Sequence, residues 1–128
     1  MATIKIDDIE LIESLIQPNT KVIYAESPTN PAIDILDLEA IGSIAKKHNI
    51  RVLGSNSLGV IVPWLNLNAS FSPVTALPGK IAFVSQSAAV CTTILDWAND
   101  KEIGFSAFIS IGNGSDIGFS ELLDYLST

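Results

Sequence analysis

Apolar residues follow two alternating patterns along the chain, short unbroken runs and runs at helical spacing. Residues 81–84 form a short apolar run directly after a Pro-Gly pair, which is typical of a strand buried on both faces. The segment after this run places apolar residues on one face of a helix, namely Val90, Cys91, Ile94, Leu95 and Ala98. The stretch of residues 79–97 therefore predicts a strand, a tight turn and a helix.

The same two patterns predict the other elements of the chain. Further strands are expected at residues 3–6, 21–25, 50–53, 60–62 and 105–111. Further helices are expected over residues 7–17, 37–49 and 119–126. Two prolines within residues 27–31 require a loop there, because proline donates no backbone hydrogen bond. Residues 54–78 are rich in Asn, Ser and Pro, so we expect them to be irregular apart from the strand at 60–62.

Alternating strands and helices indicate an α/β fold. We expect a single domain over residues 1–128, with three αβα layers around a mainly parallel sheet of about five strands. The expected strand order is 2-1-3-4-5, which is flavodoxin-like or, more broadly, Rossmann-like. A sheet of this kind leaves an exposed edge strand, which a homodimer could cover.

Composition narrows the classes of function. The chain has 14 acidic and 7 basic residues and a net charge of −7, which argues against binding to nucleic acid or to an anionic membrane. Hydrophobic residues make up 48% of the chain, which excludes disorder. No apolar run approaches the roughly 20 residues of a membrane span, and the N-terminus lacks the pattern of a signal peptide. The single cysteine, Cys91, predicts no disulfide and indicates a reducing, cytoplasmic setting.

Small polar residues follow the run at residues 81–84, at the expected N-terminus of a helix. Ser85 and Ser87 could cap this helix, or their hydroxyls and the free backbone N–H groups could bind a phosphate. The residues alone leave both readings open. Cys91 is expected to fill the core rather than to act as a nucleophile.

The first part of the chain resembles a known enzyme family. Residues 21–53 read KVIYAESPTNPAIDILDLEAIGSIAKKHNIRVL, and the ESPTNP loop before a D-L-E-A-I helix is similar to the fold-type I pyridoxal-phosphate enzymes of cysteine and methionine metabolism. The resemblance implies an aspartate for the pyridinium nitrogen after residues 50–53 and a later lysine for the Schiff base. Here the sequence reads Gly54-Ser55-Asn56, and the next lysine is Lys80. We therefore expect no pyridoxal chemistry, and Asn30, which matches a family residue near the substrate carboxylate, has no cofactor beside it.

The second part resembles a different family. The stretches GSNSLGVIVPWLNLNASFSP, GKIAFVSQSAAVCTTILDWA and GFSAFISIGNGSDIGFSELLDYL are similar to the NDP-forming acyl-CoA synthetases and to the succinyl-CoA synthetase alpha subunit. Their details are most similar to the synthetase-like domain of bacterial protein lysine acetyltransferases. The resemblance implies a phosphohistidine on a loop further along the family's sequence and a separate nucleotide domain. The single histidine here, His48, lies in the other part of the chain, where we expect it at an exposed helix end.

The two resemblances meet near residue 50. We therefore interpret the chain as an engineered or recombined chimera, with residues 1–50 like the pyridoxal-phosphate enzymes and residues 51–128 like the acyl-CoA synthetases. We expect no catalytic residues, no metal site, no required cofactor and no required partner. The alternative is a remnant that binds phosphate, sulfate or CoA weakly through Ser85, Gln86, Ser87, Ala88, Gly112, Asn113 and Gly114.

Overall fold

A computed structural model describes residues 8–20 and 22–127, and the chain divides into two compact units. Unit 1 is Met1–Ile50 and unit 2 is Arg51–Thr128. The boundary lies where the two sequence resemblances were expected to meet. The structure thus shows two separately packed units where the sequence analysis expects one domain over residues 1–128.

Unit 1 is built from two helices, α1 (Ile9–Ser14) and α2 (Leu38–Lys47). Aspartates cap both helices: Asp8 accepts a 2.9 Å bond from the N–H of Leu11, and Asp37 accepts a 2.9 Å bond from the N–H of Ala40. Leu36, Ile44 and Ala45 are the buried apolar residues described in this unit.

Residues 22–25 and 50–53 form no strand, so the expectation of strands at 21–25 and 50–53 is wrong for the residues described. The strand expected at 3–6, like Lys21 itself, lies outside the described residues. Val22 and Tyr24 expose 54% and 57% of their surface. A strand requires a second strand to which it can hydrogen-bond. The described residues of unit 1 contain no strand that could pair with residues 22–25.

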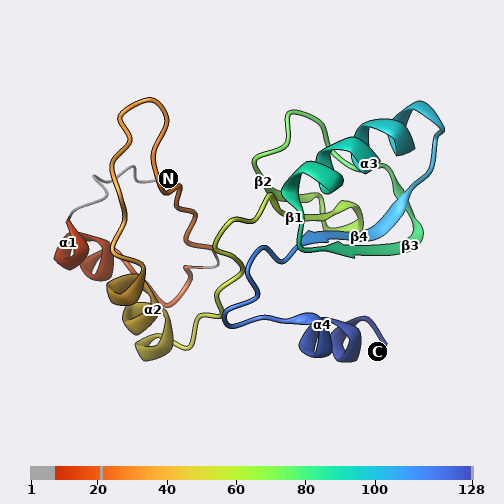
Figure 1. Cartoon of the computed structure of the whole chain (residues 1–128). Coiled ribbons are helices and arrows are strands. Elements are labelled where there is room, and N and C mark those ends of the chain that lie inside the picture. The colour runs from red at the N-terminus through yellow and green to blue at the C-terminus, as the bar shows by residue number, and fades with distance from the viewer. Residues whose placement is uncertain (1–7, 21, 128) are drawn as a thin grey trace. The chain divides into compact units, whose positions relative to one another are not determined.

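Unit 2 contains a four-stranded sheet in the order β2-β1-β4-β3 (Figure 1). The strands are β1 (Gly59–Val62), β2 (Leu67–Ser70), β3 (Pro78–Ser85) and β4 (Phe105–Ser110). β1 is antiparallel to both β2 and β4, and β3 is parallel to β4. The central strands are therefore β1 and β4, and the edges are β2 and β3.

Two helices cover opposite faces of this sheet (Figure 1). On one face, α3 (Ala88–Asp100) packs through Cys91, Leu95 and Ala98 against a cluster that contains Ile61, Phe105 and Phe108. On the other face, α4 (Phe119–Leu126) packs through Leu122 against Ala107, Ile109 and Ile111. Unit 2 therefore has the three αβα layers that the sequence predicted.

The sheet itself differs from the prediction in strand number, direction and order. The α/β class is confirmed, but the sheet has four strands rather than five, and two of its three strand pairs are antiparallel. Residues 54–78, expected to be mostly irregular, contain the β1–β2 hairpin. Its connection is the short 3₁₀ helix η1 (Pro63–Leu65) followed by Asn66 in the left-handed region, at φ 51°. So short a connection can join only antiparallel strands.

Three phenylalanines hold β3 and β4 together on the α3 face. The ring of Phe108 stacks on that of Phe83 with centroids 4.8 Å apart and meets the ring of Phe105 edge-on at 5.0 Å. Only 1% of the surface of Phe108 is exposed. Each buried aromatic ring removes a large apolar area from water, so this cluster anchors the parallel pair of strands.

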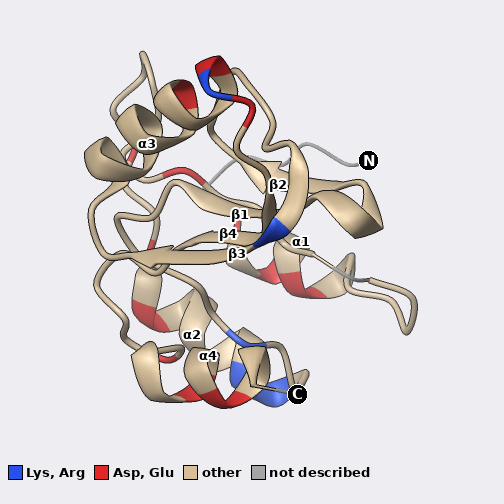
Figure 2. Cartoon of the chain, turned by 90° about the vertical axis from the view of Figure 1, so that its right-hand side faces the viewer, with Lys and Arg blue, Asp and Glu red and all other residues tan. Residues whose placement is uncertain are grey.

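Charged residues lie mainly on the helices and in the loops, whereas the strands are almost free of them (Figure 2). Lys80, near the start of β3, is the one charged residue in the four strands described. Within residues 8–20 and 22–127, each helix is too short or too polar to cross a membrane.

Candidate functional site

Three segments of unit 2 meet at one end of its sheet, where β3 and β4 terminate. β3 and β4 are parallel and both end there, at Ser85 and Ser110. β1 is antiparallel to β4 and begins there, with Gly59 opposite Ser110. The turn after β3, the turn after β4 and the loop before β1 are therefore neighbours.

Ser85 at the end of β3 and Ser87 after it form the cap of helix α3. Ser87 is the N-cap residue, and its hydroxyl accepts a 3.2 Å hydrogen bond from the N–H of Val90. The hydroxyl of Ser85 accepts a 3.1 Å bond from the N–H of Ser87. Of the two readings that the sequence left open, the structure therefore gives Ser87 the capping role.

The first N–H groups of α3 remain available beside this cap. The N–H groups of Ala88 and Ala89 have no acceptor among the described residues, as is usual in the first turn of a helix. Gln86 and Ser87 are exposed, whereas Ser85 and Ala88 are half-buried. This turn keeps the features that favour an anion, namely free donors and the positive end of a helix dipole.

Gly112 allows the turn after β4 to lie against the loop before β1. Its φ is +58°, and a Cβ atom built on it would lie 2.0 Å from the carbonyl oxygen of Ser55. The next residue, Asn113, donates from its backbone N–H to the same oxygen at 2.9 Å and from its side chain to the Ser55 hydroxyl at 3.1 Å. The glycine therefore serves the approach of two loops.

Gly114 is in a different environment. It also has a positive φ, at +64°, but a Cβ atom there would meet no atom closer than 3.7 Å. Its N–H donates to the carbonyl of Ile111 at 3.2 Å, which closes the turn.

A buried hydroxyl ties the same loop to the end of β4. Ser110 is the one fully buried polar residue among those described, and its hydroxyl accepts a 3.0 Å bond from the N–H of Leu58. The Ser57 hydroxyl donates to the carbonyl oxygen of Ser110 and accepts a 2.9 Å bond from the N–H of Gly59. These bonds satisfy backbone groups that the start of β1 would otherwise bury unpaired.

Cys91 lies in the first turns of α3, near the end of the sheet formed by Ser85 and Ser110. It is 0% exposed, and burial raises the pKa of its thiol, although the hydroxyls of Ser110 and Ser85 act in the opposite direction. A buried thiol held in its protonated form is a poor nucleophile. The prediction that Cys91 lies on the buried face is confirmed.

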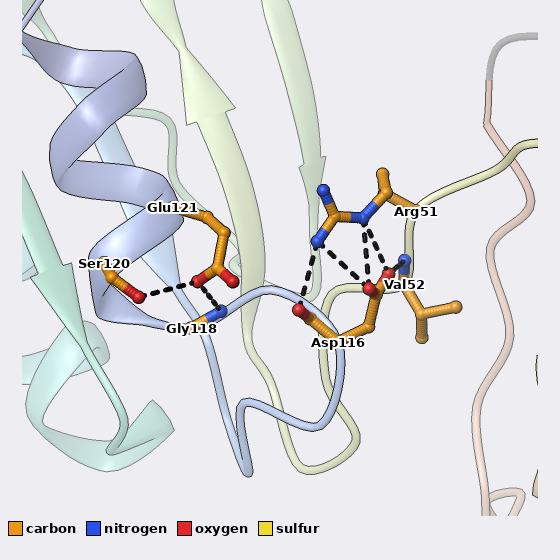
Figure 3. A network of polar contacts seen from close by, with 6 residues as sticks. All are labelled: Arg51, Val52, Asp116, Gly118, Ser120 and Glu121. Atoms are coloured by element: carbon orange, nitrogen blue, oxygen red, sulfur yellow. Dashed lines mark hydrogen bonds and ion pairs between the residues drawn. The ribbon is translucent and has the colours of Figure 1, made fainter.

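A second polar network ties the start of unit 2 to the loop before α4 (Figure 3). The Arg51 guanidinium lies 3.0 Å from Asp116 Oδ2 and donates at 3.1 Å to the Asp116 carbonyl oxygen. The Val52 N–H donates to Asp116 Oδ2 at 2.6 Å. The Arg51 hydrogen bonds, followed by that from Val52, hold the pKa of Asp116 below its ordinary value.

Glu121 has a separate role within the same view (Figure 3). Its carboxylate accepts a 3.2 Å bond from the N–H of Gly118 and a 3.1 Å bond from the hydroxyl of Ser120, at the N-terminus of α4. Backbone and hydroxyl donors lower the pKa of Glu121, and Arg51 contributes least to this shift. Sequence reasoning did not identify these two networks. The donors to Asp116 come from Arg51 and Val52, which lie more than 60 residues earlier, and one donor to Glu121 is a backbone N–H group.

The candidate residues of unit 1 lie at exposed, structurally occupied positions. Asn30 is exposed, in the loop of residues 27–31. His48 Nε2 and Lys47 Nζ lie 3.1 and 2.6 Å from the same oxygen of Glu13, and hydrogen bonds from Lys47 and then His48 lower the pKa of Glu13. His48 is the C-cap residue of α2, at the helix end where it was expected.

The residues at the junction do not suit a pyridoxal cofactor. The segment after residues 50–53 offers Gly54, Ser55 and Asn56, none of which carries the carboxylate that a pyridinium nitrogen requires. Ser55 and Asn56 instead contact Gly112 and Asn113. Among the described residues, no group of three His, Cys, Asp or Glu side chains could hold a metal ion.

Two family models match the chain. Residues 1–69 match the Cys/Met metabolism PLP-dependent enzyme family, and residues 78–128 match the succinyl-CoA ligase like flavodoxin domain. The first match extends 19 residues past the boundary between the units. Both expected resemblances are thus confirmed. The finer expectation of a domain like that of protein lysine acetyltransferases stays a prediction.

Individual relatives fall into the same two groups, acyl-CoA ligases and enzymes of cystathionine metabolism. An acetate–CoA ligase [ADP-forming] of Methanocaldococcus jannaschii is 48% identical over 85 residues, which are 66% of this chain and 12% of that protein. A cystathionine beta-lyase of Staphylococcus haemolyticus is 48% identical over 46 residues, 36% of this chain and 12% of that protein. The chain thus spans about an eighth of the length of either relative.

A solved structure resembles most of the chain. The dinucleotide forming acetyl-coenzyme A synthetase 1 of Ca. Korarchaeum cryptofilum, in complex with phosphate and ADP, superposes with a TM-score of 0.65 and 31% identity. The match covers 84% of this chain and 23% of that one.

The structure places the predicted anion-site residues on neighbouring turns. The carbonyl oxygen of Ser85 accepts a 2.9 Å bond from the N–H of Ile111, which joins the turn of residues 85–88 to that of residues 112–114. Binding of an anion there stays a prediction. Ser55 and Ser110 also form hydrogen bonds at this end of the sheet, and sequence reasoning did not connect them with these turns. The polar Ser110 at the end of an apolar strand was the one local indication.

Replacing Gly112 by alanine should destabilise unit 2 more than replacing Gly114. Both alanines would adopt a left-handed backbone, at a cost of about 1–2 kcal/mol. Only the alanine at residue 112 would also overlap the Ser55 carbonyl, which adds roughly 1–3 kcal/mol. Urea unfolding followed by the fluorescence of Trp64 and Trp97 measures both changes. Equal destabilisation by Gly112→Ala and Gly114→Ala would contradict the close packing of the two loops.

Replacing Arg51 by glutamine should raise the pKa of Asp116 toward its ordinary value. The rise should be incomplete, because the Val52 N–H still donates to the carboxylate. A lowered carboxyl pKa stabilises the folded state fully above about pH 4 and progressively less as the pH falls through the lowered value. The stability difference between the parent and Arg51→Gln should therefore shrink from about pH 5 to pH 2. Carboxyl NMR titration measures the pKa, and Glu121 is the internal control because its main donors are unchanged.

Proposed function

Because the chain belongs to the Cys/Met metabolism PLP-dependent enzyme family through residues 1–69 and carries a succinyl-CoA ligase like flavodoxin domain at residues 78–128, we propose that it is a chimera. In this proposal an engineered or natural recombination joined the two segments near residue 50. The product folds as an α/β protein and has no complete active site and no catalytic activity of its own.

The observation that carries the proposal is the use of the loop after the junction. In the pyridoxal-phosphate family the position after residues 50–53 supplies an aspartate to the cofactor. Here Ser55 accepts hydrogen bonds from Asn113 and leaves no room for a side chain at residue 112. The loop thus serves the packing of the acyl-CoA-synthetase-like unit.

Four reactive side chains, those of Lys47, His48, Cys91 and Lys101, support the same conclusion. The imidazole of His48 and the ammonium group of Lys47 both contact the same carboxylate oxygen of Glu13. The Lys101 ammonium group lies 2.7 Å from Asp100. Cys91 is buried with a raised pKa. Each of these groups therefore has a structural environment that accounts for it.

A second candidate function is weak binding of phosphate or of a CoA phosphate at the turn of residues 85–88. Two free N–H groups at the start of the 13-residue helix α3 favour it, as does the likeness to a synthetase that was solved with phosphate and ADP. Gly112, Asn113 and Gly114 lie on the adjacent turn.

The purified chain should show no turnover. With pyridoxal phosphate and cystathionine, or with ATP, acetate and CoA, product should not form faster than in the protein-free blank, because the required side chains are missing. The assay of product by chromatography over several hours sets the limit, and an intact acetate–CoA ligase is the positive control. Product formation above the blank would overturn the proposal.

Phosphate and CoA should shift the amide resonances of residues 85–89, with saturation in the millimolar range. The variant Ala88→Pro should reduce these shifts, because it removes one free N–H group. Proline is tolerated at the first helical position, and Ser87 already has the extended backbone that a following proline favours, at φ −90° and ψ 113°. Binding that is unchanged in Ala88→Pro would place the anion elsewhere. The absence of shifts with parent protein up to 10 mM would eliminate the site and leave the chimera proposal untouched.

A further inference from the structure

An asparagine–glycine pair lies in the turn after β4. Asparagine is among the thermally labile residues, because the backbone nitrogen of the next residue can attack its side-chain amide. Glycine favours this attack, since it carries no Cβ atom and its backbone is the least restricted. Asn113 is followed by Gly114, and no other asparagine of the sequence is followed by glycine. This pair is therefore the place in the sequence where the reaction is chemically easiest.

The reaction needs these two residues and water. The nitrogen of Gly114 forms a bond with Cγ of Asn113 and gives up its proton, and the side-chain nitrogen takes up a proton and leaves as ammonia. Water then opens the resulting imide ring at one of its two carbonyl–nitrogen bonds. Cleavage at Cγ gives aspartate, and cleavage at the main-chain carbonyl gives isoaspartate. Either product replaces a neutral amide with a carboxylate, and no atom changes its oxidation state.

The space around the pair admits such a ring. Asn113 is exposed, so water reaches its amide. A Cβ atom built on Gly114 would meet no atom closer than 3.7 Å. Gly112, two residues earlier, has no comparable room, because a Cβ atom there would lie 2.0 Å from the Ser55 carbonyl oxygen. The open side of the turn is thus the side on which the reaction takes place.

Hydrogen bonds hold both reacting groups in the folded turn. The side-chain amide of Asn113 donates to the Ser55 hydroxyl at 3.1 Å, and its backbone N–H donates to the Ser55 carbonyl at 2.9 Å. The attacking N–H, that of Gly114, donates to the Ile111 carbonyl at 3.2 Å. These bonds must break before the two groups can meet, so the reaction requires a local opening of the turn.

We propose that Asn113 is a site of deamidation and that its contact with Ser55 sets the rate. While the loop before β1 lies against the turn, the Asn113 side chain is held away from the Gly114 nitrogen. When the contact opens, the pair reacts as it does in a flexible peptide. A free energy of opening of about 1.4 kcal/mol corresponds to an about tenfold slower reaction. All three residues belong to unit 2, so the reaction does not depend on how the two units are arranged.

Timed incubation of the full chain in mildly alkaline buffer, followed by tryptic digestion and mass spectrometry, tests the site. Deamidation adds about one dalton and one negative charge. Asn113 is the one asparagine among residues 102–128, so a gain in the peptide that begins after Lys101 is assigned to it. The parent should convert about ten to a hundred times more slowly than a synthetic peptide of residues 109–117. Conversion at the peptide's rate, or none while the peptide converts completely many times over, would overturn the proposal.

The variant Ser55→Ala tests the contact. It removes the hydroxyl that holds the Asn113 amide and keeps the Ser55 carbonyl, so conversion at Asn113 should become several times faster. Ser115→Ala, at an exposed serine of the same turn, is the matched control and should leave the rate unchanged. Thermal unfolding checks that both variants fold. Equal rates in the parent and in folded Ser55→Ala chains would contradict a role for the contact.

Hydrogen exchange measures the same opening without any substitution. The backbone N–H of Asn113 is bonded to the Ser55 carbonyl and exchanges only when the contact opens. The factor by which folding slows this exchange should be of the same order as the factor by which it slows deamidation. A large disagreement between the two factors would show that another motion controls the reaction and would overturn the role proposed for Ser55.

Discussion

The burial of β4 on every side organises unit 2. β1 and β3 pair with its two edges, and α3 and α4 cover its two faces. A strand so enclosed must place an apolar side chain on each face in turn, and all its residues except Ser106 are buried. The one buried polar side chain of β4, that of Ser110, accepts a hydrogen bond from the N–H of Leu58, and this bond offsets the cost of burying its hydroxyl.

The parts of the fold that the sequence predicted are those set by local periodicity. The apolar run at residues 105–111 and the helical spacing of Cys91, Leu95 and Ala98 reflect the layers that bury them. The run at residues 81–84 does lie in β3, but the expectation that it is buried on both faces is wrong, because β3 is an edge strand and Ile81 is 51% exposed. The hairpin of β1 and β2 was missed in part because its strands are four residues long, and loop-forming residues surround them. Residues 22–25 have the composition of a strand but no neighbour to pair with, a condition that no local pattern reveals.

The candidate site shows the same division between local and distant causes. The capping role of Ser87 follows from residues three positions apart and could be predicted. The constraint on Gly112 arises from Ser55, which lies 57 residues earlier, so the close approach of a second loop to this glycine could not be predicted from the local sequence. The Arg51–Asp116 tie is equally remote in sequence and joins the first residues of unit 2 to the loop before α4.

The position of Cys91 has a practical consequence for measuring the dynamics of unit 2. Its sulfur is enclosed by the core on the α3 face, and its raised pKa keeps the thiol protonated. A thiol reagent can reach it only when α3 separates from the sheet, so the rate of labelling reports how often that layer opens. The chain thus carries a natural labelling site for this opening at a single sulfur atom, and no residue has to be substituted to create it.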